Sequence, residues 1–187
     1  MIRWIVPRRV VRRITEVAPS ELLAIGIRGL ILDLDNTLLP PSEEEPPAEV
    51  VAWLEDLHRA GLRTVLVSNA LPSRVRRVCG RLGCSAVGGF PKPNPIRLRR
   101  AMGVLGTTPP ETAAIGDQVF TDVLPANLLG LYTILVDPLH PREFLSTRLL
   151  RCLERAVGRE WTVFRGGQES SCGGRTRKET LSGRPWR

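Results

Sequence analysis

The chain has 187 residues, 42% of them apolar and only 5% aromatic, so aliphatic side chains must form the core of a single domain. Its formal net charge of +8 favours an anionic partner: a phosphorylated substrate, a nucleic acid or an acidic membrane surface. Four cysteines without a CxxC pair and two histidines do not match the usual zinc-site spacings, and no apolar run approaches the roughly 18 residues of a membrane span.

Residues 1–14 mix apolar side chains with five arginines and contain no acidic residue. Together with Trp4, this composition suits binding at the interface of an anionic bilayer. Each cation near such a surface contributes about 1 kcal/mol to the binding free energy. The alternative is an arm that packs its apolar side on the domain and leaves its arginines in water. Pro7 and Arg8 interrupt any signal peptide. We therefore expect residues 1–26 to be a basic amphipathic arm of a cytoplasmic protein, one that binds peripherally to the inner face of the membrane if the first interpretation holds.

The next segment, residues 30–38, runs from apolar side chains into two aspartates. The apolar run predicts a buried parallel strand, and Asp33 and Asp35 would lie at its carboxyl end, where open α/β sheets bind ligands. Burying two carboxylates is costly unless they are protonated, paired with cations, or bound to a metal that in turn holds an anionic partner. This strand end is therefore the leading candidate for chemistry.

The rest of the chain alternates helices and strands after a proline-rich acidic loop at 40–47. We expect further strands at 63–67, 85–87, 113–115 and 132–136, and helices at 48–60, 72–82, 95–105, 120–129 (interrupted by Pro125) and 141–157. This alternation predicts a doubly wound, Rossmann-like parallel sheet of five strands with helices on both faces, within a catalytic domain at 27–160. Residues 166–187 have little to bury and predict a disordered basic tail.

Polar side chains follow three of these strands. They are Asp33 and Asp35, then Ser68 and Asn69, then Asp117, with Lys92 in a loop and Asp122 shortly after Asp117. Each has an ordinary structural explanation alone, as a cap, a turn or a surface charge. Together, carboxylates from neighbouring strands would make an oxygen site suited to Mg²⁺. Ser68 can then bond a phosphate oxygen, and Lys92 can neutralise its charge.

In this order and spacing, the residues resemble the haloacid dehalogenase superfamily. The matching motifs are Asp33-Leu-Asp-Asn-Thr37, Ser68-Asn69, Lys92-Pro93 and Gly116-Asp-Gln-Val-Phe-Thr-Asp122. Within the superfamily, Gly26-Ile-Arg-Gly29 and Leu131-Tyr-Thr-Ile-Leu-Val136 are similar to the YqeG-like group, subfamily IIIA, which is related to phosphatidylglycerophosphate phosphatases. The resemblance covers about residues 1–158.

The resemblance implies a role for each motif residue. Asp33 would be the nucleophile that forms an aspartyl-phosphate, and Asp35 the general acid and base. Mg²⁺ would be held by the Asp33 carboxylate, the Asp35 backbone carbonyl, Asp117 and Asp122. Ser68, Asn69 and Lys92 would bind the phosphate. The short gaps between motifs leave no room for a cap domain, so the site should be open to a phosphate carried on a large surface.

These features lead to one main function and two alternatives. The main expectation is a Mg²⁺-dependent phosphatidylglycerophosphate phosphatase of phospholipid synthesis. The second is a soluble phosphatase of sugar phosphates or nucleotides. The third is a nucleic-acid-binding module with an idle phosphatase fold, which the complete set of motifs and the lack of aromatics interleaved with basic residues argue against.

Overall fold

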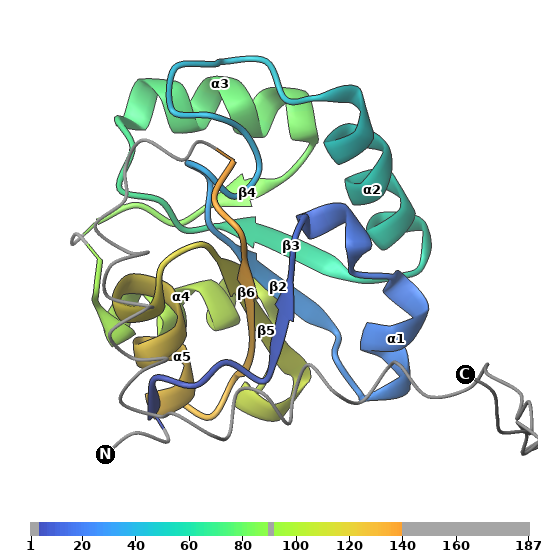
Figure 1. Ribbon diagram of the computed structural model, residues 1–187, viewed down its shortest axis with the longest axis vertical. Helices are drawn as coiled ribbons and strands as arrows, with labels where there is room; N and C mark the ends of the chain where they lie inside the picture. The colour runs from blue at the N-terminus through green and yellow to red at the C-terminus, as the bar shows by residue number, and fades with distance from the viewer. Residues whose placement is uncertain (1–3, 90–91, 140–187) are drawn as a thin grey trace, which may run out of the picture. The chain divides into compact units, whose positions relative to one another are not determined.

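The computed structural model describes residues 4–89 and 92–139. Its helices and strands are β1 (Arg9–Val11), η2 (Ile14–Glu16), α1 (Pro19–Ala24), β2 (Gly29–Leu32), α2 (Ala48–Arg59), β3 (Arg63–Leu66), α3 (Pro72–Leu82), β4 (Ser85–Ala86), α4 (Pro95–Leu105), η3 (Pro109–Glu111), β5 (Thr112–Gly116), η4 (Val119–Val123), α5 (Leu124–Leu128) and β6 (Tyr132–Val136). The strands form one parallel sheet in the order β1-β6-β5-β2-β3-β4, with helices on both faces (Figure 1). The predicted doubly wound α/β fold is confirmed.

The sheet has six strands rather than the predicted five, because β1 is added at its edge. Arg9 pairs with Ile134 and Val11 with Val136, so the N-terminal segment lies beside the last strand (Figure 1). A three-residue basic strand is too short for an alternating pattern, and its partner is distant in sequence. The predicted number of strands was therefore too low by one, the edge strand β1.

The end of β1 and the residues that follow it pack into the core. Val11, Ile14 and Val17 are 7%, 3% and 0% exposed, and they join the apolar cluster that α1 and α2 also contribute to. The indole nitrogen of Trp53 on α2 donates a hydrogen bond to the Val17 carbonyl at 2.8 Å. The apolar side of this segment therefore packs on the domain.

Part of the same segment stays on the surface. Trp4 is 44% exposed, and its carbonyl accepts a hydrogen bond from Asn127 at 2.8 Å. Because Trp4 precedes β1 in a parallel sheet, it lies toward the edge at which the strands begin. Arg12 is exposed and directly follows β1, so it lies toward the opposite edge, where the strands end.

The central strand β2 is buried on both faces. Leu30 and Leu32 belong to the apolar cluster of α1, α2 and α3, whereas Ile31 belongs to the cluster of α4 and α5. A strand covered on both sides needs a continuous apolar run, which is what the sequence has here. This layering fixes the carboxyl end of β2 in the middle of the sheet.

The connection from β2 to β3 is short. Residues 33–62 contain a tight turn, the loop at 40–47 and α2, and no separate cap domain is inserted there. The helix expected at 120–129 is divided into the π-helical turn η4, which carries Asp122, and α5. Pro125 is the second residue of α5, so the division between the two helical turns falls beside a residue that cannot donate an intrahelical hydrogen bond.

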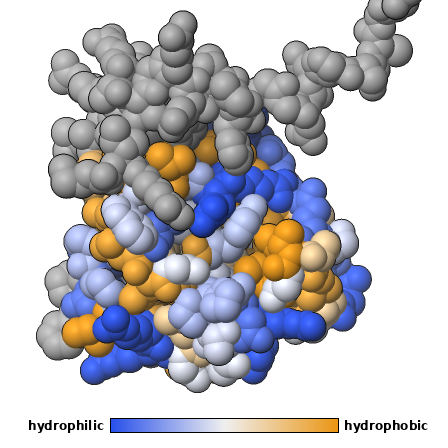
Figure 2. Space-filling model, turned by 90° about the horizontal axis from the view of Figure 1, so that it is seen from below, coloured by the Kyte–Doolittle hydropathy of each residue, from blue (hydrophilic) through white to orange (hydrophobic). Residues whose placement is uncertain are grey.

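Among the described residues, none of the helices combines the length and the hydropathy that crossing a membrane would require. On the face seen in Figure 2, apolar side chains form several patches separated by polar and charged ones. The helix predicted at 141–157 and the tail predicted at 166–187 lie outside the described residues.

Candidate active site

The chain turns sharply directly after β2, and this turn fixes Asp33. The Asp33 amide still belongs to the sheet, because it donates to the carbonyl of Ile115 at 2.9 Å. Asn36 then takes a left-handed conformation with φ 61°, which asparagine tolerates better than most residues, and the Leu38 amide donates back to Leu34 at 2.9 Å. The first aspartate is therefore held on a rigid strand end.

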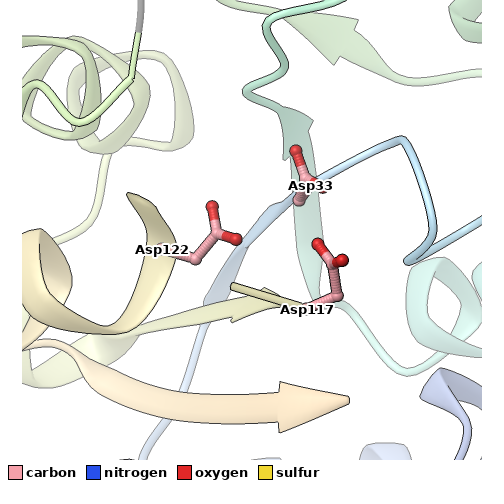
Figure 3. Close-up of side chains that lie close together, drawn as sticks. All are labelled: Asp33, Asp117 and Asp122. Carbon is pink, nitrogen blue, oxygen red and sulfur yellow. The ribbon is translucent and has the colours of Figure 1, made fainter. Parts of the chain in front are cut away.

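Three of the predicted aspartates meet at this edge of the sheet. Asp33 follows β2, Asp117 follows β5, and Asp122 comes from η4 (Figure 3). One carboxylate oxygen from each residue lies within 4.8 Å of the others, and all three residues are buried. The topology thus brings together carboxylates that are far apart in sequence.

Lys92 contacts two of these carboxylates. Its ammonium donates to Asp33 Oδ1 at 2.5 Å and to Asp122 Oδ1 at 2.7 Å, and its side chain is 8% exposed. Burial lowers the pKa of Lys92, but the charges of Asp33 and Asp122 outweigh it and leave the pKa raised. The lysine is therefore a fixed positive charge beside Asp33.

The carboxylate cluster carries more negative charge than Lys92 can compensate. Burial, followed by the charges of Asp33 and Asp122, raises the pKa of Asp117 to about 7. Burial also raises the pKa of Asp122 to about 6, with Lys92 opposing the rise and Asp33 adding to it. Within the described part of the chain, Asp117 Oδ1 is buried without a hydrogen-bond partner. Three converging carboxylates with an unpartnered oxygen fit a divalent cation such as Mg²⁺.

Gly116 allows Asp122 to come this close to the end of β5. A Cβ atom at this position would lie 2.4 Å from both Asp122 Cγ and Asp122 Oδ2. Any side chain at position 116 would therefore displace the Asp122 carboxylate.

Ser68 and Asn69 follow β3 beside the cluster. The hydroxyl oxygen of Ser68 accepts a hydrogen bond from the Ala70 amide at 3.1 Å, a bond that does not use the hydroxyl hydrogen. Asn69 Oδ1 accepts from the Lys92 amide at 2.8 Å and from Arg97 at 3.2 Å. Asn69, which the sequence predicts as a phosphate ligand, therefore holds the Lys92 loop through its side-chain oxygen.

Arg97 on α4 is a part of the site that the sequence analysis missed. The residue is 3% exposed, and its Nη2 donates to the carbonyls of Ser68 at 2.7 Å and Val87 at 2.8 Å. In the sequence it belongs to a basic stretch together with Arg99 and Arg100. Its spacing was an available signal, because Ala101 and Leu105, four and eight residues later, lie on the same buried stripe.

Asp35 lies apart from the carboxylate cluster. Its Oδ1 accepts a hydrogen bond from Arg74 Nη2 on α3 at 3.0 Å. Arg74 also donates to the carbonyls of Pro40, at 3.0 Å, and Glu43, so it connects Asp35 to the acidic loop. The Asp35 carboxylate is thus positioned by α3. The metal contact that the sequence predicts for Asp35 is made by its backbone carbonyl and not by this carboxylate.

Comparisons with known proteins agree with this arrangement. The profile of the haloacid dehalogenase-like hydrolase family matches residues 41–130. The chain is 30% identical over 155 residues to a Bacillus subtilis protein described as "Probable phosphatase YqeG", covering 83% of this chain and 90% of that protein.

Two further proteins are similar over much of the chain. The chloroplastic phosphatidylglycerophosphate phosphatase 1 of Chlamydomonas reinhardtii is 29% identical over 153 residues, covering 76% of this chain and 57% of that protein. The fold matches the cobalt-bound deoxy-D-mannose-octulosonate 8-phosphate phosphatase of Haemophilus influenzae with a TM-score of 0.50 and 19% identity, covering 71% of this chain and 90% of the other. The chain therefore belongs to the haloacid dehalogenase-like hydrolase family and is a phosphatase of that family.

Proposed function

We propose that the protein is a Mg²⁺-dependent phosphomonoester hydrolase in which Asp33 is the nucleophile. The observation that carries this proposal is the setting of the Asp33 carboxylate, which contacts Lys92 at 2.5 Å and lies in one cluster with Asp117 and Asp122. A buried carboxylate beside a fixed cation can approach phosphorus only if the charge of the phosphate is also compensated. Lys92 is the fixed cation, and a divalent cation held by the three carboxylates would compensate the charge of the phosphate.

In this proposal, Asp33, Asp117 and Asp122 would hold the cation, together with the backbone carbonyl of Asp35. When bound, Mg²⁺ supplies charge neutralisation between the carboxylate nucleophile and the phosphate dianion. The unpartnered Asp117 Oδ1 and the raised pKa values of Asp117 and Asp122 support the assignment, because each reflects negative charge that a cation would compensate.

The protein's own residues would then carry the reaction in two steps. An Asp33 oxygen forms a bond to phosphorus as the bond to the leaving alkoxide breaks, and Asp35 donates a proton to that alkoxide. Asp35 next takes a proton from the water that hydrolyses the aspartyl-phosphate, which releases inorganic phosphate and restores Asp33. Ser68 and Lys92 would stabilise the negative charge on the transferring phosphoryl oxygens.

For the substrate, we propose phosphatidylglycerophosphate, presented on an anionic membrane surface in phospholipid synthesis. Similarity to the chloroplastic phosphatidylglycerophosphate phosphatase supports this substrate, as does the absence of a cap domain from residues 33–62. Of the N-terminal residues, Arg12 is better placed than Trp4 to contact a membrane that the site faces, because only Arg12 lies toward the edge where the strands end. Nucleic acid is not an expected partner.

The test compares substrates with the same purified enzyme. We expect Mg²⁺-dependent release of inorganic phosphate from phosphatidylglycerophosphate in anionic vesicles to exceed release from soluble sugar phosphates and nucleotides by at least tenfold in kcat/KM. A reversed preference would make the protein a soluble phosphatase. Failure to hydrolyse any phosphomonoester would contradict the function as a whole.

Asp33→Asn tests the nucleophile within the same assay. The substitution keeps the shape of the side chain and removes the attacking charge, so phosphate release should fall below one thousandth of the wild-type rate. Asp56→Asn is the matched control, because Asp56 is exposed on α2 and pairs with Arg59 instead. Turnover by Asp33→Asn within tenfold of wild type would exclude the covalent mechanism.

A further inference from the structure

We propose that Arg97 is a positioning residue for the phosphoryl group: its buried guanidinium fixes the Ser68 backbone and, through Asn69, the loop that carries Lys92, and it attracts the phosphoryl anion. The proposal rests on the phosphatase function proposed above. It goes beyond that function because it assigns a role to a residue outside the family motifs.

The guanidinium of Arg97 joins the ends of two neighbouring strands. It donates to the Ser68 carbonyl after β3 at 2.7 Å and to the Val87 carbonyl after β4 at 2.8 Å. A third donor reaches Asn69 Oδ1 at 3.2 Å. A planar group with several donors in a fixed geometry can hold three oxygens at once, which a lysine ammonium does less well. Arg97 thereby sets the position of the Ser68 backbone.

A chain of contacts leads from Arg97 to the proposed nucleophile. Asn69 Oδ1, which accepts from Arg97, also accepts from the Lys92 amide at 2.8 Å. The ammonium of Lys92 contacts Asp33 Oδ1 at 2.5 Å. A displacement of the Arg97 guanidinium would therefore move both groups that are proposed to bind phosphate.

Among the described residues, Arg97 has no direct counterion. Across the described ranges, no carboxylate pairs with its guanidinium within 4.0 Å, and its partners are neutral oxygens. Burial lowers the pKa of Arg97, and only the more distant charge of Asp33 opposes this effect. A buried cation without a counterion is costly for stability, so folding alone does not account for it. A phosphoryl anion bound between Ser68 and Lys92 would add a second negative charge, besides that of Asp33, that attracts the guanidinium.

The experiment compares Arg97→Met, Arg97→Lys and the control Arg99→Met, which changes an exposed arginine on the same helix. Binding of inorganic phosphate in the presence of Mg²⁺ is measured by calorimetry, kcat and KM with p-nitrophenyl phosphate, and unfolding by thermal melting. We expect Arg97→Met to weaken phosphate binding and to lower kcat/KM by at least tenfold. The melting temperature reports separately the balance between relief of the buried charge and loss of the donor to the Ser68 and Val87 carbonyls. Arg97→Lys should recover part of the phosphate affinity, and Arg99→Met should stay within twofold of wild type.

Phosphate affinity within twofold of wild type in Arg97→Met would overturn the proposal, whatever happens to the melting temperature. If Arg97→Met does not fold, Arg97→Lys decides by the same measurement, since it keeps the charge and loses the planar donor set. Equal phosphate affinity in Arg97→Lys and wild type would then show that the donor geometry is not needed. If the wild-type protein binds phosphate but hydrolyses no phosphomonoester, the proposed function is contradicted. The role of Arg97 in phosphate binding is then still decided by the affinities of the Arg97 variants.

Discussion

Replacement of Gly116 by alanine tests how closely the carboxylate cluster is packed. The added Cβ would lie 2.4 Å from Asp122 Cγ and 2.7 Å from Asp122 Cβ. Carbon atoms in contact are separated by about 3.5–4.0 Å, so the Asp122 side chain must move by roughly 1 Å. Asp122 cannot move freely, because one carboxylate oxygen accepts a hydrogen bond from Lys92 and the other accepts one from the Gln118 amide.

The size of the effect follows from this displacement. A misplacement of about 1 Å in a catalytic arrangement lowers the rate by about 10²-fold, which corresponds to about 2.7 kcal/mol in the activation free energy. Overpacking of a buried site also lowers the free energy of unfolding by about 1–3 kcal/mol. Gly116→Ala should therefore remain folded and lose most of its kcat, with a weaker apparent affinity for Mg²⁺.

The assay measures kcat over a range of Mg²⁺ concentrations, together with urea unfolding. Gly103→Ala is the matched control: Gly103 is exposed on α4, and its added Cβ would meet no atom within 4 Å. Alanine is favoured over glycine in a helix by about 0.5–1 kcal/mol, so the control should be slightly more stable with unchanged kcat. If Gly116→Ala kept kcat within threefold of wild type, the close packing of Asp122 would not matter for activity.

Two further predictions concern stability. In the presence of a chelator, the free energy of unfolding should fall as the pH rises from about 4 to about 7. Asp117 and Asp122 have pKa values of about 7 and about 6 in the folded state. Over this pH range the folded state therefore retains protons that the unfolded state has released. In thermal melts, Mg²⁺ should restore stability at pH 8, and Asp117→Asn should flatten the pH dependence. A melting temperature that rises from pH 5 to pH 8 in chelator would contradict the raised pKa values of the two aspartates. Trp53→Phe should lower the free energy of unfolding by about 1–3 kcal/mol in urea titrations, because the buried Val17 carbonyl loses its donor, and an unchanged midpoint would refute this.

The meeting of Asp33 and Asp117 could be predicted from the sequence, whereas the place of the Asp35 carboxylate beside Arg74 could not. Asp33 and Asp117 follow apolar strands, and parallel strands end at the same edge of a sheet, so their meeting depends only on topology. Lys92 was found through its motif, and the structure adds its contacts with Asp33 and Asp122. The assigned roles of these residues remain predictions.

Arg74 could not be assigned from local patterns in the same way, because it lies on a helix with several exposed arginines and the packing of that helix decides which of them faces the site. For Arg97, the spacing to the buried residues of α4 marked a buried position but not its partners. Their partners are mostly backbone carbonyls, which no sequence pattern marks. The strand β1 was missed for a related reason: it exists through its pairing with β6, and three residues carry too little local preference to predict it.

The place of β1 in the sheet has a consequence for how the protein is made. Arg8 and its partner Thr133 are separated by 125 positions in sequence, so β1 leaves the ribosome long before its neighbouring strand exists. The backbone of β1 must therefore stay unpaired, or be shielded by a chaperone, until β6 has been synthesised. An edge strand that joins through such a distant contact completes the sheet late.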